Sequence, residues 1–248
     1  IKDEIYAIRR HFHRYPELSF KEFNTAETIS EHLNNLGISH KKSVGKTGIV
    51  GEINFGPGPT IALRADMDAL PIQEENNLDY KSLNDGVMHA CGHDGHMAIL
   101  LGAANALSKN SKLKKGTVRF IFQPAEEGLG GAKYMIEDGC LDKVDEIYGL
   151  HLWNYQLYGE VGIKDGPVMA SADLFDIEVS GKGGHGATPQ GTIDAIVVAS
   201  NLVTMLQTIV SRNTNPLEST VLSIGKIKGG NNFNIISDKV HMSGTTRA

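Results

Sequence analysis

The sequence predicts an α/β protein with a larger first domain and a smaller second one. Short apolar stretches alternate with helical stretches through residues 1–170, which is typical of a mostly parallel sheet. Polar side chains follow several of these apolar stretches, where α/β proteins place their sites. The composition changes after residues 164–167, and we therefore expect domains at residues 1–170 and 171–248.

The bulk composition narrows the class of protein. The 248 residues are 40% hydrophobic and 21% charged, which fits a soluble globular protein. A net charge of −5 without a run of like charges offers no basic surface, so we expect neither nucleic acid nor a membrane as a partner. Two cysteines, Cys91 and Cys140, cannot build a disulfide framework, which favours the cytoplasm. We find no apolar stretch of membrane-spanning length and no signal peptide.

Two helices open the chain. Apolar side chains recur every three or four residues over 3–13 and 21–36, and Gly37 suits the cap that ends the second helix. His11 and His13 lie at the end of the first helix. They could be catalytic, or they could belong to a partly exposed helix end, and the sequence leaves both readings open.

Four segments of the first domain have the pattern of strands, because they are short, apolar and bounded by turn residues. They cover residues 48–55, 60–65, 117–122 and 146–150. Helices are expected between the last three strands, at about 97–107 and 132–138. This alternation predicts that the carboxyl ends of the strands share one sheet edge.

Potential ligands follow three of these strands. Asp66 and Asp68 come after the second strand, Glu126 and Glu127 after the third, and His151 after the fourth. Solvated turn aspartates and a surface glutamate pair are the simpler interpretations of the carboxylates. Because parallel strands would bring all of these residues to one edge, we expect a site there.

The densest group of polar residues is the segment 89–96, which contains three histidines, a thiol and a carboxylate. Cys91 and His93 would project from the same side of an extended segment and resemble two metal ligands. Thiolate, imidazole and carboxylate together suit zinc or another first-row divalent metal better than calcium or magnesium. With Glu127 and a bridging Cys91 they could hold two metals, and Glu126 would then be a general base.

The second domain has the order strand, helix, strand, strand. The strands are expected at residues 172–179, 220–227 and 239–245 and the helix at about 192–212. One helix can cover one face of such a sheet, so this part of the chain predicts a smaller α/β domain.

Five segments resemble, in order, the motifs of the M20 metallopeptidase family. They are Arg64–Pro71, His89–Asp94, Gln123–Glu127, Gly149–His151 and Gly184–Ala187. The likeness is to the amidohydrolase branch that cleaves N-acyl amino acids, such as aminoacylase, hippurate hydrolase, N-acetyldiaminopimelate deacetylase and auxin-conjugate hydrolase. It implies a zinc-peptidase-like catalytic domain with an inserted ferredoxin-like lid and dimerisation domain.

The resemblance also implies roles for single residues. The implied ligands of two divalent ions, Mn, Zn, Co or Ni, are Cys91, His93, Glu127 and His151. Glu126 would be the general base and Asp68 would orient a ligand. His89, Asp94 and His96 are expected to orient the ligands or to be structural.

The implied roles in the lid concern the substrate. His185 would reach the active site of a partner subunit in a homodimer and stabilise the tetrahedral oxyanion. Asn234 and Arg247 match positions that hold the substrate's carboxylate. The family has a further metal-binding histidine near its C-terminus for which this chain has no motif, and Gln190 stands where many relatives carry a histidine. We therefore expect an incomplete form of the family.

The leading hypothesis is a metal-dependent amidohydrolase that cleaves acetyl, benzoyl or similar N-acyl amino acids. A nucleophilic Cys91 with a histidine base is a competing mechanism, but it leaves Glu126, Glu127 and His151 without roles. A metal-binding or dimerising remnant of the family is the non-enzymatic alternative. A dipeptidase is a less favoured enzymatic one.

Overall fold

The computed structural model describes residues 2–110, 112 and 114–248. The chain divides into two compact units, Ile1–Tyr158 and Gly159–Ala248. This division comes earlier than the boundary predicted at residue 170. Residues 150–171, all of them described, connect the last strand of the first unit to the first strand of the second without a helix or strand.

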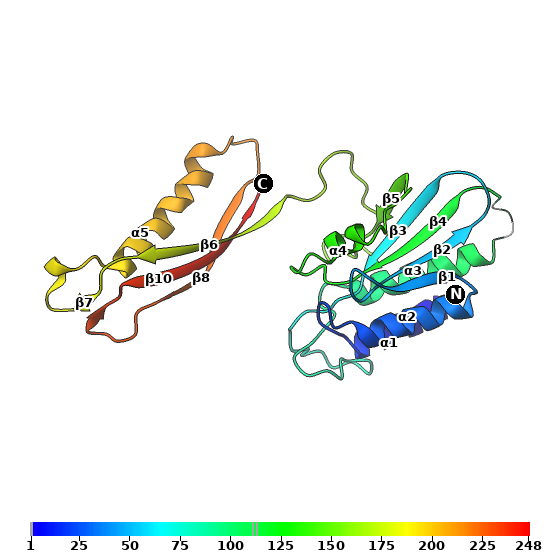
Figure 1. Ribbon diagram of the computed structural model, residues 1–248, viewed down its shortest axis with the longest axis horizontal. Helices are drawn as coiled ribbons and strands as arrows, with labels where there is room; N and C mark the ends of the chain where they lie inside the picture. The colour runs from blue at the N-terminus through cyan, green and yellow to red at the C-terminus, as the bar shows by residue number, and fades with distance from the viewer. Residues whose placement is uncertain (1, 111, 113) are drawn as a thin grey trace. The chain divides into compact units, whose positions relative to one another are not determined.

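The first unit contains all the helices and strands predicted for it, and one strand more (Figure 1). Its elements are α1 (Lys2–Arg14), α2 (Phe23–Asn35), β1 (Ser39–Val44), β2 (Gly48–Asn54), β3 (Thr60–Asp66), α3 (His93–Ser108), β4 (Thr117–Gln123), α4 (Gly131–Glu137) and β5 (Glu146–Gly149). The unpredicted strand, β1, is polar because it lies at the sheet edge, and only Val44 in it is buried.

The sheet of the first unit is mixed, with the order β1-β2-β4-β3-β5. Strand β3 pairs in parallel with β4 and β5, whereas β1, β2 and β4 pair antiparallel. The expectation of a mostly parallel sheet is therefore wrong for β1 and β2. Gly45 and Lys46 between these two strands both have left-handed backbone, with φ of 61° and 79°, which makes a tight hairpin and hence an antiparallel pair.

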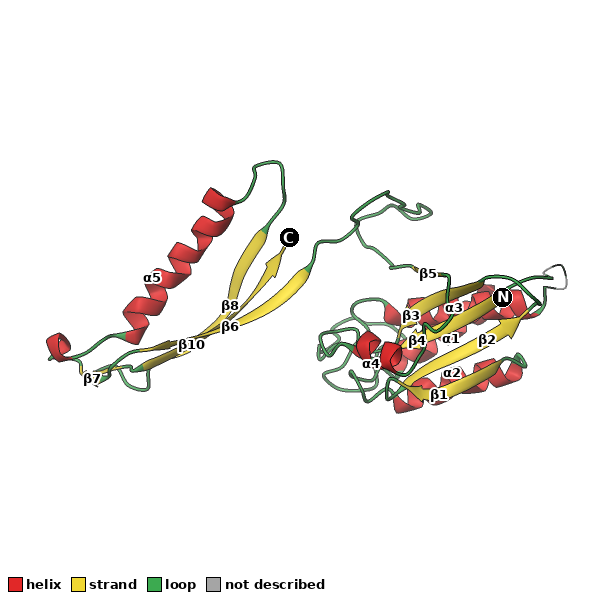
Figure 2. Ribbon diagram, turned by 45° about the horizontal axis from the view of Figure 1, so that its top comes forward, coloured by secondary structure: helices red, strands yellow, loops and turns green. Residues whose placement is uncertain are grey.

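Helices cover both faces of this sheet, with α1, α2 and α3 on one face (Figure 2). Phe120 and Phe122 of β4 are fully buried against these helices. Ile121, between them in sequence, faces the opposite way and packs on Met135 of α4. This alternation is why residues 117–122 read as a strand with two buried faces.

The parallel strands end together. Asp66 of β3 is level with Gln123 of β4, and Arg64 is level with Gly149 of β5. The segments that follow β3, β4 and β5 therefore start at the same edge of the sheet. This confirms the edge that the strand pattern predicted for the polar residues.

The second unit is an antiparallel sheet of order β6-β10-β8 with α5 on one face. Its elements are β6 (Ala172–Ser180), β7 (Gly184–His185), the 3-10 turn Pro189–Gly191, α5 (Ala195–Thr208), the π-turn Ile209–Asn213, β8 (Val221–Gly229), β9 (Ile235–Ile236) and β10 (Lys239–Arg247). The helix predicted over 192–212 begins at Ala195 because Asp194 caps it, accepting hydrogen bonds from the amides of Ile196 (2.9 Å) and Val197 (3.2 Å).

The segment Ala195–Asn213 is long and apolar enough, by length and composition alone, to cross a membrane. The expectation that no stretch reaches this length is therefore wrong. The same composition occurs in core helices of soluble proteins. Here Ala195 and Ala199 pack on Val240 and Met242 of the sheet, while most of the segment is exposed.

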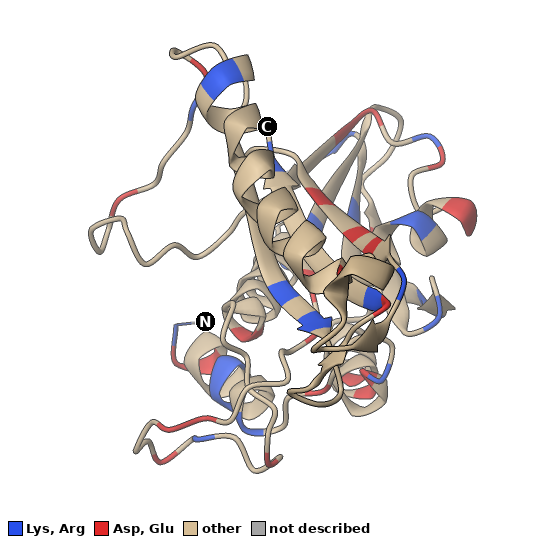
Figure 3. Ribbon diagram, turned by 90° about the vertical axis from the view of Figure 1, so that its left-hand side faces the viewer, with Lys and Arg blue, Asp and Glu red and all other residues tan. Residues whose placement is uncertain are grey.

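Charged residues of both signs are interspersed along the ribbons of each unit, as Figure 3 shows. The edge strand β1 is an example, because Lys42 pairs with Glu27 of α2 at 2.6 Å. Such exposed pairs contribute little to stability, so the fold depends on its apolar contacts.

The packing of β4 gives a direct test of the core. Replacing Phe120, which is 0% exposed, by alanine should lower the free energy of unfolding by about 3–5 kcal/mol, because the cavity cannot be refilled. Urea denaturation followed by circular dichroism would measure the change. The matched control is Phe233→Ala in the second unit, where the ring is 98% exposed and a change within about 0.5 kcal/mol is expected. Equal losses in both variants would contradict the assignment of the core.

Candidate metal centre

The segment 89–96 is not extended. Gly92 has left-handed backbone (φ 90°) directly before α3, and His93 is the first residue of that helix. The expectation that Cys91 and His93 project from one side of an extended segment is therefore wrong. The chain turns sharply at Gly92 instead, a conformation that a residue with a Cβ rarely adopts.

The hydrogen bonds that each imidazole ring makes decide which histidines of the first unit can bind a cation. The Nδ1 atom of His93 lies 2.8 Å from the carbonyl oxygen of Asp68, and the Nδ1 atom of His151 lies 2.6 Å from the carbonyl oxygen of Leu152. A carbonyl only accepts, so each Nδ1 carries a proton and each Nε2 keeps a lone pair, which in His151 faces the Sγ atom of Cys91 at 3.5 Å. Both rings thus present Nε2 as a ligand.

His96 differs from these two residues. Its Nδ1 atom lies 2.6 Å from Asp66, and its Nε2 atom accepts a hydrogen bond of 2.9 Å from the amide of Leu152. Both ring nitrogens are therefore hydrogen-bonded, and His96 orients its neighbours instead of binding a cation.

Potential ligand atoms gather around His93. One group joins Cys91, His93 and His151, and another joins His93, Glu126 and Glu127, with the ligand atoms of each group within 4.8 Å of one another. The Sγ atom of Cys91 is 3.5 Å from Nε2 of His151. All five residues come from segments that follow the parallel strands or open α3.

Two of these atoms lack a partner that a cation would supply. Nε2 of His93 and Oε1 of Glu127 are 3.9 Å apart, and both are buried without a hydrogen bond among the described residues. In the neutral form of His93 each offers a lone pair, so neither donates to the other, and an unsatisfied buried polar atom is costly. A divalent cation fits this arrangement, and the sulfur, nitrogen and oxygen donors suit a first-row metal.

The carboxylates around the centre disfavour a free thiolate. Burial, and then the charge of Glu127, raises the pKa of Cys91 to about 12. A thiol with this pKa is protonated near neutral pH and is a poor nucleophile, which weakens the alternative that Cys91 attacks the substrate. A bound cation would reverse this effect by favouring the thiolate.

Asp68 connects the segments that carry the ligands. Its Oδ1 and Oδ2 atoms accept hydrogen bonds of 3.0 Å from the amides of Glu126 and Glu127, and Oδ2 also accepts one of 2.7 Å from the hydroxyl of Ser19. Burial alone would raise the pKa of Asp68, but hydrogen bonds with His93 and Ser19 hold it below its usual range. The predictions missed Ser19, which belongs to no motif and lies far from Asp68 in sequence.

His13 proves to be buried, whereas His11 is exposed. The two ring nitrogens of His13 lie 2.9 Å from Asp94 and 3.1 Å from Glu74. Asp94 also accepts a hydrogen bond of 3.1 Å from Arg9. His13 thus connects α1 to the start of α3. These contacts indicate a structural role for Asp94 and His13 and not a catalytic one.

The residues expected to contact the substrate lie in the second unit. His185 is exposed, and its Nδ1 atom accepts a hydrogen bond of 3.1 Å from the amide of Ala187. Asn234 is close to His185, because its carbonyl accepts from the amide of Gly186 at 2.8 Å. Arg247 ends β10, about 26 Å from the start of that strand at 3.3 Å per residue. The unit therefore separates Arg247 from the other two residues.

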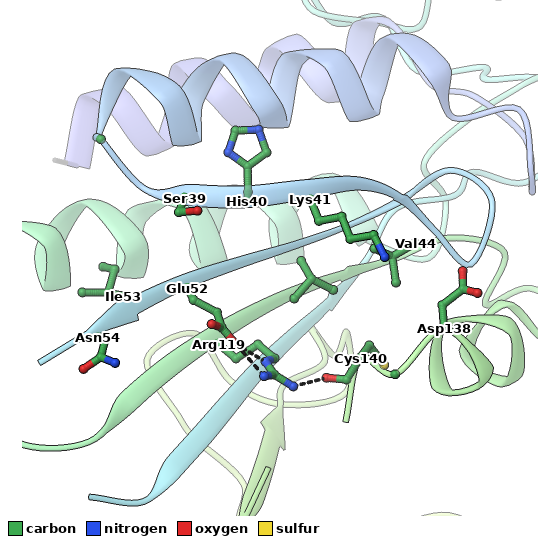
Figure 4. Close-up of a pocket in the computed structure, with 13 residues that line it drawn as sticks. Ser39, His40, Lys41, Val44, Glu52, Ile53, Asn54, Arg119, Asp138 and Cys140 are labelled. Carbon is green, nitrogen blue, oxygen red and sulfur yellow. Dashed lines mark hydrogen bonds and ion pairs between the residues drawn. The ribbon is translucent and has the colours of Figure 1, made fainter. Parts of the chain in front are cut away.

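A hollow of about 690 Å³ lies elsewhere in the first unit, between β1, β2 and the end of α4 (Figure 4). None of the predicted site residues lines it. Its one arginine, Arg119, is 2.6 Å from Glu52 and also donates to the carbonyl of Cys140 at 2.8 Å. Since this positive charge is already paired, Arg119 is not free to bind an anionic ligand in the hollow.

Comparison with known proteins identifies relatives over the whole chain. The model of peptidase family M20/M25/M40 matches residues 62–245. The chain is 50% identical over 248 residues to the N-acetyl-L-cysteine deacetylase of Bacillus subtilis (strain 168), covering 100% of this chain and 60% of the relative. It is 47% identical over 249 residues to the N-acyl-L-amino acid amidohydrolase of Geobacillus stearothermophilus, covering 100% of this chain and 67% of that protein.

A solved structure shows the same fold. The YXEP protein of Bacillus subtilis, described as a dinuclear metal binding peptidase from the M20 family, matches with a TM-score of 0.81 and 41% identity over 99% of this chain. The chain covers 64% of that protein, so it spans roughly 60–67% of the length of these relatives.

The contacts of Asp68 predict its effect on metal binding. Asp68→Asn should weaken the affinity for Mn²⁺ or Zn²⁺ about 10–100-fold, because an amide cannot accept from both Glu126 and Glu127 with its two end atoms. Isothermal titration calorimetry would measure the affinity, with the exposed Asp85→Asn as the control. A folded Asp68→Asn protein with unchanged affinity would show that this carboxylate does not hold the centre.

Proposed function

The chain belongs to peptidase family M20/M25/M40, and we propose that it forms the metal-binding part of an amidohydrolase that cleaves N-acyl amino acids. The observation that carries the proposal is the pair of unsatisfied buried atoms, Nε2 of His93 and Oε1 of Glu127, beside Cys91 and His151. Relatives named as a deacetylase of N-acetyl-L-cysteine and as an N-acyl-L-amino acid amidohydrolase support this class of substrate.

Four residues would hold the metal: Cys91, His93, Glu127 and His151. Two divalent ions, with Mn, Zn, Co and Ni as the candidates, would draw on these two groups of ligand atoms, which have His93 in common. Bound ions of this kind lower the pKa of water and polarise a carbonyl group.

Glu126 would act as the general base. Glu126 is exposed beside the buried ligand His93, and its backbone amide is held by Asp68. Partial burial of its carboxyl group, together with the charge of Glu127, raises the pKa of Glu126 above its ordinary value, which favours proton transfer near neutral pH. Glu126 would take the proton of the attacking water and pass it to the leaving amine.

His185 would stabilise the oxyanion that forms on the substrate. Because its Nδ1 atom accepts from the amide of Ala187, the ring proton resides on Nε2, which is exposed as a donor. A neutral donor of this kind suits the charge that develops on the carbonyl oxygen.

A homodimer through the second unit would complete the site. Arg247 ends β10, whereas Asn234 precedes β9 and lies beside Gly186, so two copies of the chain would bring the two side chains to one carboxylate. The outer side of α5 exposes apolar residues, among them Val197 at 56% and Met205 at 65%, as expected of a contact with a second copy.

We place the protein in the cytoplasm. Cys91 and Cys140 are both free thiols, which agrees with a reducing compartment.

A dipeptidase is the second candidate function, favoured by the description of the solved relative as a peptidase. Assays with dipeptides alongside acetyl- and benzoyl-amino acids would separate the two substrates.

The role of Glu126 can be tested by one substitution. In the protein expressed from its complete gene, Glu126→Gln should lower kcat about 10²–10⁴-fold, because the amide cannot accept the water's proton. Metal affinity, measured by calorimetry, should be retained. Glu137→Gln, at an exposed position of α4, is the matched control and should keep full activity. Normal turnover by a metal-loaded Glu126→Gln protein would refute the choice of base.

Mixing two inactive variants tests the contribution of the partner subunit. If His185 serves the site of the other copy, a mixture of Glu126→Gln and His185→Ala chains should recover about one quarter of wild-type activity, because random pairing leaves one intact site in half of the dimers. Turnover of N-acetyl amino acids after exchange of subunits would measure this. No recovery, with mixed dimers shown by native mass spectrometry, would place His185 at the site of its own chain or at none.

A further inference from the structure

Three consecutive backbone amides after β4 are held by two buried carboxyl groups. The amide of Ala125 donates to Oε1 of Glu22 at 2.9 Å. The next two amides donate to the two oxygens of Asp68 at 3.0 Å each. Every amide of the segment that carries Glu126 and Glu127 is therefore oriented by a side chain from elsewhere in the first unit.

Glu22 is unusual because it is buried and makes no ion pair with another described residue. It lies at the start of α2 with 0% of its surface exposed. Its second oxygen accepts a hydrogen bond of 2.6 Å from the hydroxyl of Thr47, in the hairpin between β1 and β2. Burial raises the pKa of Glu22 despite these hydrogen bonds. Burying a carboxyl group costs free energy, so we expect Glu22 to have a structural role that offsets this cost.

The turn that Glu22 holds is strained. Ala125 is fully buried and has left-handed backbone, with φ of 50°, a conformation that is unfavourable for a residue with a side chain. The turn closes where the amide of Gly131 donates to the carbonyl of Ala125 at 3.0 Å. A Cβ atom at Gly131 would lie 1.8 Å from the carbonyl of Pro124, so no other residue fits there. Such a conformation persists only if its surroundings enforce it.

We propose that Glu22 is a positioning residue, which holds the left-handed turn at Ala125 and thereby aims Glu126 and Glu127 at the centre. Glu22 contacts none of the ligands and acts only through the amide of Ala125. It also links α2 and the β1–β2 hairpin to the site through Thr47. This inference rests on the proposed function for its effect on turnover, but its effects on the turn and on metal affinity are independent of it.

Two substitutions of Glu22 distinguish the effect of its hydrogen bond to Ala125 from the effect of its charge. Glu22→Gln keeps an oxygen that can accept from Ala125, and its amide group can donate to Thr47. Glu22→Met has a similar length but offers no acceptor, so the buried amide of Ala125 loses its partner. The matched control is Glu17→Met, because Glu17 accepts from the amides of Asn24 and Thr25 at the same helix start but contacts nothing in the turn.

The first readout is hydrogen exchange of the peptide that covers residues 124–131. In Glu22→Met this exchange should be at least about 10-fold faster than in the wild type, while Glu22→Gln should stay within about 3-fold. Calorimetry with Mn²⁺ should show an affinity about 10-fold weaker for Glu22→Met alone. In the protein expressed from its complete gene, kcat should fall with KM nearly unchanged, because the substrate does not touch Glu22.

Several results would overturn the inference. A folded Glu22→Met protein with wild-type exchange in the turn would do so, and so would a loss in Glu22→Gln as large as in Glu22→Met. If Glu17→Met accelerated exchange in the turn equally, general destabilisation would explain the effect. A wild-type protein that binds Mn²⁺ but turns over no N-acyl amino acid would refute the proposed function, while exchange and metal affinity would still decide the role of Glu22.

Discussion

The carboxylate of Asp68 is the constraint on which the candidate site depends. It leaves the sheet at the end of β3, accepts the amides of the segment after β4, and stands beside His93, whose proton is fixed by the carbonyl of the same residue. Because a buried carboxylate is tolerated only when its oxygens are well paired, its donors have little freedom to move. One residue thus sets the relation between the start of α3 and the turn that carries both glutamates.

The parallel part of the sheet makes this arrangement possible. Strands β3, β4 and β5 end at the same level, so the segments that follow them begin as neighbours. The antiparallel hairpin β1–β2 does not contribute ligands, but Thr47 in it contacts Glu22, which holds the amide of Ala125. The turn is thereby supported by Asp68, which follows the parallel strand β3, and by Glu22 of α2, which Thr47 of the antiparallel hairpin contacts.

Local patterns predicted most of the fold, and the misses have physical causes. The alternation around Phe120, Ile121 and Phe122 is a property of neighbouring residues, so it shows in sequence. Strand β1 lacks such a pattern, since an exposed edge strand needs no apolar face. The extended reading of the segment with Cys91 and His93 failed because Gly92 adopts a left-handed conformation, which no periodicity reveals.

The sequence by itself determined which donor types follow which strands, because side-chain chemistry and strand pattern are both local properties. Only the tertiary structure decided which histidines keep a free lone pair. In His93 and His151 only Nδ1 is hydrogen-bonded to a carbonyl group. In His96 both ring nitrogens are hydrogen-bonded, one to Asp66 and one to Leu152. Most of these partners lie far away in sequence, so their hydrogen bonds exist only once the strands and α3 have packed.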